Sequence, residues 1–155
     1  MQVALPKAAV GRLERIDQGP WAGWATWAND PFEIHAGPFY VRWGEDGEPV
    51  CAFRVEPRHV NASGGLHGGC MMAFADFALF IIAWKGLGED RAVTASFSGD
   101  FLGSVGVGAL VECRGEIVKA GRSMVFVRGL ITSGPEPIMS FQAVMKKTKL
   151  AGTST

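Results

Sequence analysis

The residues best suited to chemistry lie in one stretch, residues 61–84 (NASGGLHGGCMMAFADFALFIIAW). Its first part is a polar, glycine-rich loop that contains His67, and its second part is a nearly unbroken apolar run that contains one charge, Asp76. A lone carboxylate inside an apolar helix is unfavourable unless it is paired, neutralised or functional. Asp76 is therefore either a carboxylate with hydroxyl or amide partners at a helix contact, or a catalytic base or nucleophile.

The residues His67, Gly68 and Gly69 lie at the expected start of the same helix. Free backbone N–H groups and the positive end of the helix dipole gather there, and glycine lets a ligand approach the backbone closely. An oxyanion or a polarised carbonyl would bind at such a place, although two glycines can also serve only to start the helix tightly. His67 itself could be a general base, a hydrogen-bond donor or a structural histidine.

Other side chains in the sequence offer weaker signals. Asn61, six residues before His67, could cap a turn or hold a water or a carbonyl. Cys70 lies near the helix N-terminus, where a thiol can become more nucleophilic. No serine lies in a G-x-S-x-G elbow. His35 and His59 have no acidic or cysteine partner at metal spacing, so both are interpreted as structural and no metal site is predicted.

The composition indicates one globular domain. The chain has 155 residues, of which 48% are hydrophobic and 19% charged, which favours an oligomer in which partner chains cover apolar surface. Lys and Arg balance Asp and Glu at 15 each, which argues against nucleic acid as a partner. Three scattered cysteines without a CxxC motif indicate free thiols in a reducing compartment.

Localisation and membrane contact are judged from two segments. The N-terminus has no apolar core of signal-peptide length, and the apolar run is predicted as a helix over residues 70–84, shorter than the roughly 20 residues of a membrane span. We therefore expect a cytoplasmic protein without a membrane partner. Lys85 in the last turn and Gly86 as the C-cap are expected to end this helix.

The hydrophobic pattern predicts mainly strands joined by short turns, which favours the α+β class. An N-terminal extension over residues 1–32, a main domain over 33–148 and a tail over 149–155 are expected. The predicted elements are a helix over 6–18, a Trp-rich loop over 19–31, strands over 33–43 and 49–56, the apolar helix over 70–84, and strands over 93–102, 109–119, 123–132 and 137–147. A curved antiparallel sheet around the apolar helix would bury that helix on most sides.

The motif N-x5-H-G-G-x6-D over residues 61–76 resembles the active-site stretch of hotdog-fold acyl-CoA thioesterases of the PaaI-like (phenylacetyl-CoA thioesterase) branch. The order of elements over about residues 37–147 is similar to that fold as well. The segment 93–97 (VTASF) resembles the strand that supplies a supporting hydroxyl, here Thr94. The resemblance implies a hotdog fold, in which a curved antiparallel sheet wraps around one long apolar helix.

The resemblance also implies a reaction, the hydrolysis of acyl-CoA thioesters to a free acid and CoA. The Gly68 N–H would polarise the thioester carbonyl, and Asp76 would activate water as a general base or attack the carbonyl directly. Asn61 and Thr94 would orient the water or the carboxylate. His67 would shape the loop and support the carbonyl interaction.

The substrate's CoA moiety would need further contacts, and no other cofactor is expected. The residues proposed to bind the substrate are Gly69 near the carbonyl and Lys119, Gly121 and Arg122 at a tight turn, with Arg91 and Arg58 as other candidates for the phosphates. Each cation could equally be a solvated surface charge. The three tryptophans of the N-terminal loop suggest a bulky or aromatic acyl group.

The resemblance places the site between subunits, so a homodimer at least, and a homotetramer, are expected. Two other functions stay open. A hotdog dehydratase or hydratase usually pairs a catalytic histidine with an acid in a different motif, which is missing here. A non-catalytic acyl-CoA binding protein would keep the pocket and the glycines but would not need Asp76.

Overall fold

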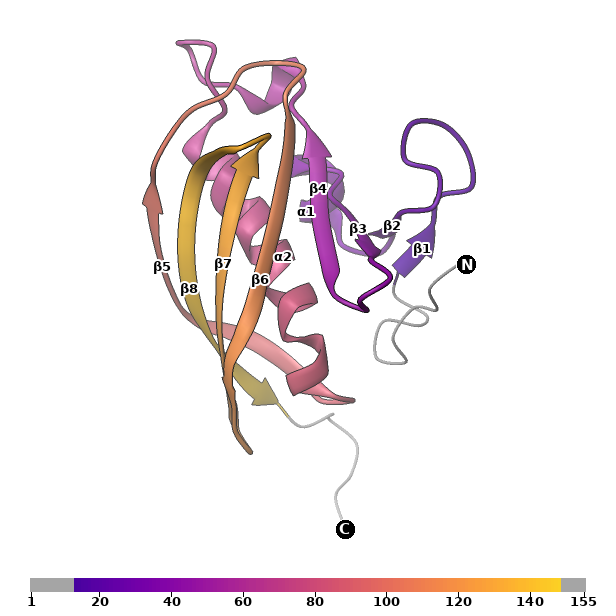
Figure 1. Ribbon diagram of the computed structural model, residues 1–155, viewed down its shortest axis with the longest axis vertical. Helices are drawn as coiled ribbons and strands as arrows, with labels where there is room; N and C mark the ends of the chain where they lie inside the picture. Colours follow the sequence, from indigo (N-terminus) through magenta and orange to yellow (C-terminus); the bar gives the residue numbers. More distant parts are fainter. Residues whose placement is uncertain (1–12, 149–155) are drawn as a thin grey trace.

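The computed structural model describes residues 13–148. An eight-stranded antiparallel sheet, in the order β1-β2-β3-β4-β6-β7-β8-β5, curves around the long helix α2 (Figure 1). The elements are β1 (Leu13–Arg15), β2 (Ala25–Trp27), α1 (Pro31–Ala36), β3 (Tyr40–Trp43), β4 (Pro49–Arg54), the 3-10 helix η1 (Pro57–His59), α2 (Gly68–Leu87), β5 (Arg91–Phe101), β6 (Leu110–Ala120), β7 (Met124–Ser133) and β8 (Glu136–Thr148). The α+β prediction of a curved sheet around one apolar helix is confirmed.

Helix α2 and the sheet share one hydrophobic core. Phe74 of α2 packs against Phe39 and Phe53, with ring centroids 4.8 to 5.3 Å apart, and all three side chains are fully buried. One face of α2 differs, because Met72 is 45% exposed and Asp76, one turn further on, is exposed too. Asp76 was expected to be buried among apolar residues, but within a single chain its side chain is exposed.

Helix α2 is longer than the predicted range of 70–84. Gly86 does not end it, because the backbone stays helical to Leu87 and Gly88 forms the C-cap with a φ of 59°. Gly86 instead allows close packing, since a Cβ built there would lie 3.1 Å from the Ala120 Cβ of β6 and 3.1 Å from the Val125 Cγ1 of β7. The predicted C-cap at Gly86 was wrong. The absence of a side chain at Gly86 allows the helix to approach the sheet closely, and it does not end the helix.

The length of α2 also corrects the expectation about membranes. With 20 residues and a mean hydropathy of 1.7, α2 is long and apolar enough to span a bilayer by length and composition. However, 56% of the residues in that apolar window are buried inside the fold. The apolar composition of α2 is thus accounted for by its position against the concave face of the sheet.

The N-terminal segment joins the sheet, unlike the predicted helix over residues 6–18. Residues 13–15 form β1, whereas residues 6–12 lie outside the described residues. Strand β2 lies within the predicted Trp-rich loop and pairs with β1 and β3. Trp21 stacks on Tyr40 of β3 with a centroid distance of 4.1 Å, so part of the tryptophan cluster covers the sheet.

The predicted strand over residues 33–43 is a helix followed by a shorter strand. The Asp30 side chain accepts a hydrogen bond from the Glu33 N–H at 2.9 Å, and Pro31 occupies the first turn of α1. An Asp N-cap followed by proline is a typical helix start, and this local signal outweighs the alternation read as a strand. The chain then becomes extended again in β3 after Gly37.

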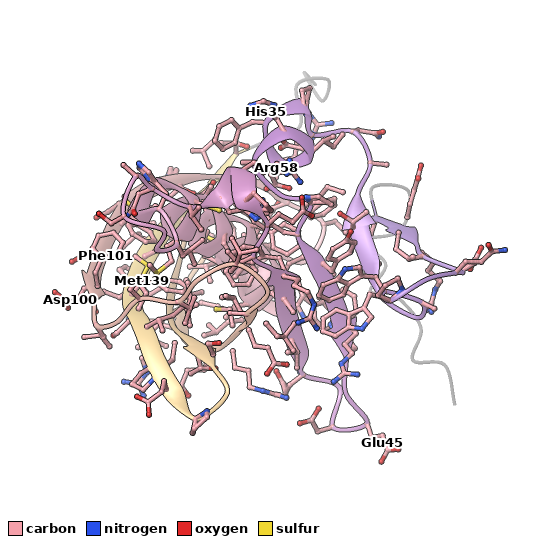
Figure 2. All side chains as sticks on the ribbon, turned by 90° about the horizontal axis from the view of Figure 1, so that it is seen from above. His35, Glu45, Arg58, Asp100, Phe101 and Met139 are labelled. Atoms are coloured by element: carbon pink, nitrogen blue, oxygen red, sulfur yellow. The ribbon has the colours of Figure 1, made fainter. Side chains whose placement is uncertain are left out.

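Strand β5 forms one edge of the sheet. It pairs only with β8 among the described strands, so its other edge is free over eleven residues (Figure 1). Val93 is 52% exposed, and Phe101, which faces Met139 in the β5–β8 register, is 53% exposed (Figure 2). A long free edge with exposed apolar side chains is a ready surface for pairing with another chain.

Candidate active site

The N-terminus of α2 presents backbone donors. His67 is the N-cap: its Nδ1 accepts from the Gly69 N–H at 2.9 Å, and its carbonyl accepts from the Met71 N–H at 3.1 Å. Within residues 13–148, the N–H groups of Gly68 and Cys70 have no hydrogen-bond partner. The Gly68 N–H is thus without a partner at the positive end of α2, and the imidazole of His67 caps the helix.

Asn61 has its side-chain oxygen engaged in the loop before α2. The Asn61 Oδ1 accepts from the Ser63 N–H at 2.9 Å and from the Gly65 N–H at 3.2 Å. The Asn61 N–H in turn donates to the Gly65 carbonyl at 2.8 Å. These bonds form a closed turn, so only the amide nitrogen of Asn61 is left to orient a water or a carbonyl.

Asp76 and Thr94 are brought together, although eighteen residues separate them in the sequence. The Thr94 hydroxyl donates to Asp76 Oδ1 at 2.8 Å. A register shift between Thr94 and Ser96 in the β5–β8 pairing lies at this contact. The hydroxyl holds one carboxylate oxygen and leaves the second able to accept a proton from water or to attack a carbonyl carbon.

The two halves of the predicted site lie apart within one chain. Gly68 and Asp76 are eight residues apart on α2, which corresponds to about 12 Å along the helix axis. A reacting carbonyl needs its oxygen near the N–H donor and its carbon about 3 to 3.5 Å from the attacking atom. One chain therefore does not bring the Gly68 N–H and the Asp76 carboxylate to the same thioester.

The predicted phosphate-binding residues lie further away still. Lys119, Gly121 and Arg122 belong to the end of β6 and the turn to β7, beside Gly86 near the C-terminus of α2. Gly86 is eighteen residues from Gly68, about 27 Å along the helix. The single chain therefore does not bring this turn to the Gly68 donor, and its role in CoA binding stays a prediction.

A cavity of about 650 Å³ lies along α2 from Asp76 towards Leu87. About half of its lining residues are aromatic or aliphatic, and the others include four acidic residues and one cation, which are Asp30, Glu33, Asp76, Asp90 and Arg91. The lining residues are Trp27, Asn29, Asp30, Glu33, Trp43, Asp76, Phe80, Ile81, Trp84, Leu87, Gly88, Asp90, Arg91 and Ala92. A cavity of this volume, with apolar walls and several convergent polar groups, is a candidate small-molecule site.

Glu33 is a cavity residue that the sequence analysis did not find. Burial raises its pKa from 4.5 to about 8, with the carboxylates of Asp30 and Asp76 adding to the shift. The Asp30-Pro31 pair could have indicated that Glu33 lies in the first turn of a helix, facing inward, instead of on a strand. At neutral pH the Glu33 carboxyl is therefore protonated, next to the carboxylate proposed for catalysis.

Glu33→Gln is expected to flatten the dependence of stability on pH. Because the pKa of Glu33 is about 8 in the folded protein against an ordinary value of 4.5, the folded state holds a proton that the unfolded chain releases between these values. The favourable contribution of Glu33 is complete below pH 4.5 and is lost as the pH rises through 8. Glutamine removes this loss, so the variant should be the more stable protein above about pH 8.

Urea unfolding at about pH 5, pH 7 and pH 8.5 measures this difference. Glu45→Gln is the matched control, because Glu45 is exposed at the tip of the β3–β4 turn, away from α1 (Figure 2). We expect this control to follow the wild-type profile. If Glu33→Gln and wild type lose stability in parallel as the pH rises, the assignment of a protonated Glu33 is wrong.

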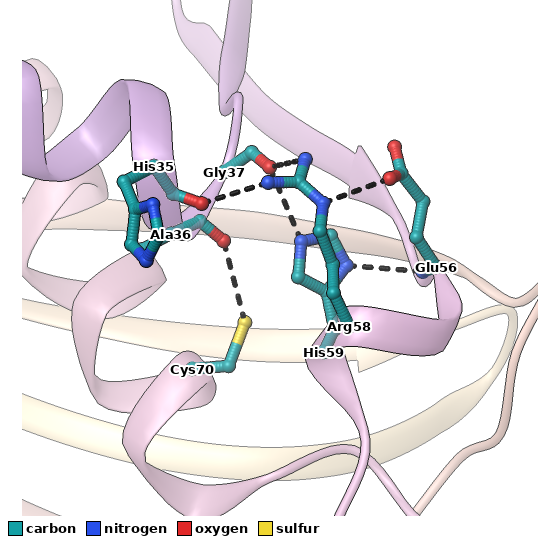
Figure 3. A network of polar contacts seen from close by, with 7 residues as sticks. All are labelled: His35, Ala36, Gly37, Glu56, Arg58, His59 and Cys70. Carbon is teal, nitrogen blue, oxygen red and sulfur yellow. Dashed lines mark hydrogen bonds and ion pairs between the residues drawn. The ribbon is translucent and has the colours of Figure 1, made fainter.

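Helix α1, which carries Glu33, is held in place by η1 (Figure 3). Arg58 donates to the His35 carbonyl at 2.7 Å, to the Gly37 carbonyl, and to Glu56 at 2.9 Å. The His59 ring lies between the Glu56 N–H at 3.0 Å and the Gly37 carbonyl at 3.2 Å. The guanidinium of Arg58 is thus engaged with the carbonyls at the C-terminal end of α1, and both η1 side chains have structural roles.

The structure also bears on Cys70 and on metals. Burial raises the pKa of the Cys70 thiol to about 11, against an opposing effect of Arg58, so the thiolate is scarce at neutral pH. Cys70 is therefore a poor nucleophile, although a second cavity of about 300 Å³ lies beside it.

In the described part of the chain, no three His, Cys, Asp or Glu side chains gather as a metal site would require.

Relatives and structures with this architecture agree on its class. The curved antiparallel sheet around one long helix is the architecture of the hotdog-fold thioesterases. The Thermus thermophilus phenylacetic acid degradation protein PaaI, in a mutant form, has a TM-score of 0.67 and 28% identity over 77% of this chain and all of that chain.

The sequence comparisons identify the family. The model of the thioesterase superfamily matches residues 63–139. The Pseudomonas aeruginosa protein PA0474, which carries a provisional esterase name, is 30% identical over 109 residues, 70% of this chain and 81% of its own length. A Buchnera aphidicola protein named as an uncharacterized acyl-CoA thioester hydrolase is 32% identical over 83 residues, 53% of this chain and 61% of its own. The chain belongs to the thioesterase superfamily.

Proposed function

We propose that the protein hydrolyses acyl-CoA thioesters to a free acid and CoA. The observation that carries this proposal is the Asp76 carboxylate, which accepts a hydrogen bond from Thr94 and lies on the wall of a cavity that has both apolar and acidic side chains. The name of the Buchnera relative supports acyl-CoA as the substrate. The aromatic and aliphatic part of the cavity wall, which includes Trp27 and Phe80, suits an acyl group.

In this mechanism, the free Gly68 N–H donates to the thioester oxygen, which gains negative charge as the carbonyl carbon becomes tetrahedral. Asp76 removes a proton from the attacking water, and collapse of the intermediate expels the CoA thiolate. In the nucleophilic variant, the Asp76 oxygen attacks the carbonyl carbon, CoA leaves, and water hydrolyses the resulting anhydride. The amide nitrogen of Asn61 would orient the water, and His67 would hold the α2 N-terminus.

We infer that two copies of the chain build each complete site. Gly68 and Asp76 of one chain are about 12 Å apart along α2, which is too far for one thioester. The exposed face of α2 at Met72 and Asp76 borders β5, whose outer edge is free in the described part of the chain. Pairing through that edge would bring a second helix N-terminus to Asp76. A tetramer, a cytoplasmic location and phosphate contacts by Lys119, Gly121 and Arg122 stay predictions.

Thiol release from short, medium, long and aromatic acyl-CoAs tests the proposed reaction directly. The expected result is catalytic release of CoA from at least one member of the panel. The acyl group of the best substrate then indicates the size and shape that the cavity accepts. Tight binding of acyl-CoA without thiol release would favour the non-catalytic binding protein instead. An enoyl-CoA and a hydroxyacyl-CoA are tested beside the panel. Hydration of the first or dehydration of the second, without thiol release, would favour a hydratase or dehydratase.

Activity is expected to return when two inactive variants are combined. Asp76→Asn removes the base, and Gly68→Pro removes the N–H donor. After unfolding together and refolding in equal amounts, about half of the dimers are mixed, and each mixed dimer has one intact site of its two, so about a quarter of wild-type activity should appear. If each site used Gly68 and Asp76 of the same chain, no activity would return. Each variant refolded alone is the control.

A further inference from the structure

Two contacts link the halves of the proposed site to opposite ends of β5. Towards the start of the strand, the Thr94 hydroxyl donates to Asp76 Oδ1 at 2.8 Å. At its end, Phe101 lies beside Gly68, because a Cβ built on Gly68 would be 3.3 Å from the Cε1 and Cζ atoms of the Phe101 ring. Thr94 therefore marks the position of the carboxylate along β5, and Phe101 marks the position of the N–H donor.

The proposed site determines how a second copy must lie against the first. The Gly68 N–H of one chain and Asp76 of the partner subunit have to reach the same thioester. Phe101 of one chain then lies level with Thr94 of the partner subunit. Because the end of one β5 meets the start of the other, the two strands run antiparallel, and a two-fold axis passes midway between the two marked positions.

The β5–β8 register locates this midpoint. Phe101 faces Met139 of β8, and Thr94 faces Met145, six residues further along β8. Counting on β8 takes account of the register shift in β5 just after Thr94. The residue halfway between these two partners faces Ser98. Ser98 is thus expected opposite Ser98 of the partner subunit, with both side chains on the same face of the sheet, as in any antiparallel pair.

The exposure of helix α2 agrees with this axis. Gly68, Met72 and Asp76 follow each other at intervals of four residues, so they form one ridge of the helix. Met72 lies halfway along this ridge, so the same axis must pass it. Between residues 71 and 80, Met72 and Asp76 are the only exposed residues, and Met72 is exposed although it is apolar. An exposed methionine at this point is what a face covered by a second copy requires.

We propose that β5 pairs antiparallel with β5 of a second copy about Ser98, and that Phe101 closes the active site against Thr94 of the partner subunit. This inference rests on the proposed function, because it takes Gly68 and Asp76 of two chains as one site. The pairing gives the free edge of β5 a partner and continues the sheet into the second chain. Phe101 is then a positioning residue, because its ring excludes water from the Gly68 N–H and so strengthens the hydrogen bond to the thioester oxygen.

Disulfide cross-linking tests this register without reference to activity. Ser98→Cys would place two thiols across the axis, with Cα atoms about 4.5 to 5.5 Å apart, which is within the range of a disulfide. We expect most of this variant to form a linked dimer under mild oxidation, as a non-reducing gel shows. Wild type, whose three cysteines lie outside β5, is the blank.

Ser96→Cys and Asp100→Cys are the matched pair of controls. In this register each residue lies about 13 Å from its own copy, whereas Ser96 faces Asp100 of the partner subunit. Neither variant should cross-link alone, but the two refolded together should do so in up to about half of the dimers. Cross-linking of either variant alone, or a Ser98→Cys protein and a mixture that both stay unlinked, would overturn the pairing.

Phe101→Ala tests the consequence for catalysis. It should lower kcat about tenfold with little change in KM, because water that reaches the Gly68 N–H weakens its bond to the oxyanion. Leu102→Ala, which removes the exposed side chain next to Phe101, should match wild type, and sedimentation verifies that both variants remain dimers. An unchanged kcat in Phe101→Ala would overturn the role of Phe101. If Ser98→Cys cross-links but no thioester is hydrolysed, the proposed reaction fails while the pairing stands.

Discussion

Asp76→Asn is expected to lower kcat for acyl-CoA hydrolysis by about 10³-fold, within the range typical of a lost general base. The amide has the shape of the carboxylate and its oxygen can still accept the Thr94 hydroxyl, which now lies at 2.8 Å from Asp76 Oδ1. However, an amide neither removes a proton from water nor attacks a thioester. The defect should therefore lie in catalysis and not in folding, as thiol release at saturating substrate measures.

The matched variant is Thr94→Val, which keeps the carboxylate and removes only the hydroxyl that holds it. We expect a loss of about tenfold, because one hydrogen bond of positioning is removed while the base remains. Sedimentation and circular dichroism should be unchanged for both variants. If the Asp76→Asn protein keeps most of its activity, Asp76 is not the catalytic carboxylate, and this conclusion does not depend on the result for Thr94→Val.

A single turnover in water labelled with ¹⁸O distinguishes the two roles of Asp76. When Asp76 acts as a general base, the labelled oxygen enters the product acid, because water attacks the thioester carbon directly. When Asp76 attacks and water then hydrolyses the anhydride at the Asp76 carbonyl, the label remains on Asp76 and the product acid takes an unlabelled oxygen. Mass spectrometry of the product acid and of the digested protein shows which of the two carries the ¹⁸O label.

The central part of this fold could be predicted from local pattern. The apolar run of α2 has enough hydrophobic residues to require burial on most sides, and the long alternating strands β6, β7 and β8 follow each other through short turns. Those features determine an antiparallel sheet around a helix almost without tertiary information. A free donor at Gly68 was also predictable, since the first N–H groups of any helix have no partner within the helix.

The errors lie where local and tertiary signals compete. The alternation over residues 33–43 suggested one strand, but the Asp30 cap and Pro31 start α1 first, and the error concealed Glu33. Val10, Leu13 and Ile16 have helical spacing in the sequence, but residues 13–15 pair with β2 as the edge strand β1. Gly86 is typical of a helix end, yet its role is contact with Ala120 and Val125. The α1 start depends on a local cap, whereas the outcomes for β1 and for Gly86 depend on partners distant in sequence.

The exposure of Asp76 has a different cause. From the sequence, an acid within an apolar run appeared buried, but in one chain it lies on the face of α2 that the sheet does not cover. The apolar residues around that face, including Met72 and Val93, are 45% and 52% exposed. Their apolar character is what a subunit interface requires, so the sequence pattern describes the proposed assembly more closely than it describes the single chain.

Gly68→Pro is expected to lower kcat/KM by about 10² to 10³-fold, the usual effect of losing one oxyanion donor. Gly68 is the first residue of α2, where proline is well tolerated. His67 before it has a φ of −64° and a ψ of 133°, a conformation that a residue preceding proline adopts readily. The substitution therefore removes the N–H while leaving the helix start in place.

Gly68→Ala is the control that separates the donor from the space around it. Alanine keeps the N–H, and its Cβ would lie 3.3 Å from the ring of Phe101, an exposed side chain that can shift. We expect Gly68→Ala to keep its activity within a few-fold of wild type, since the donor remains. Steady-state kinetics of both variants on the best substrate provide the comparison. Equal losses in the two would mean that the space beside Phe101, and not the N–H of Gly68, is what catalysis requires.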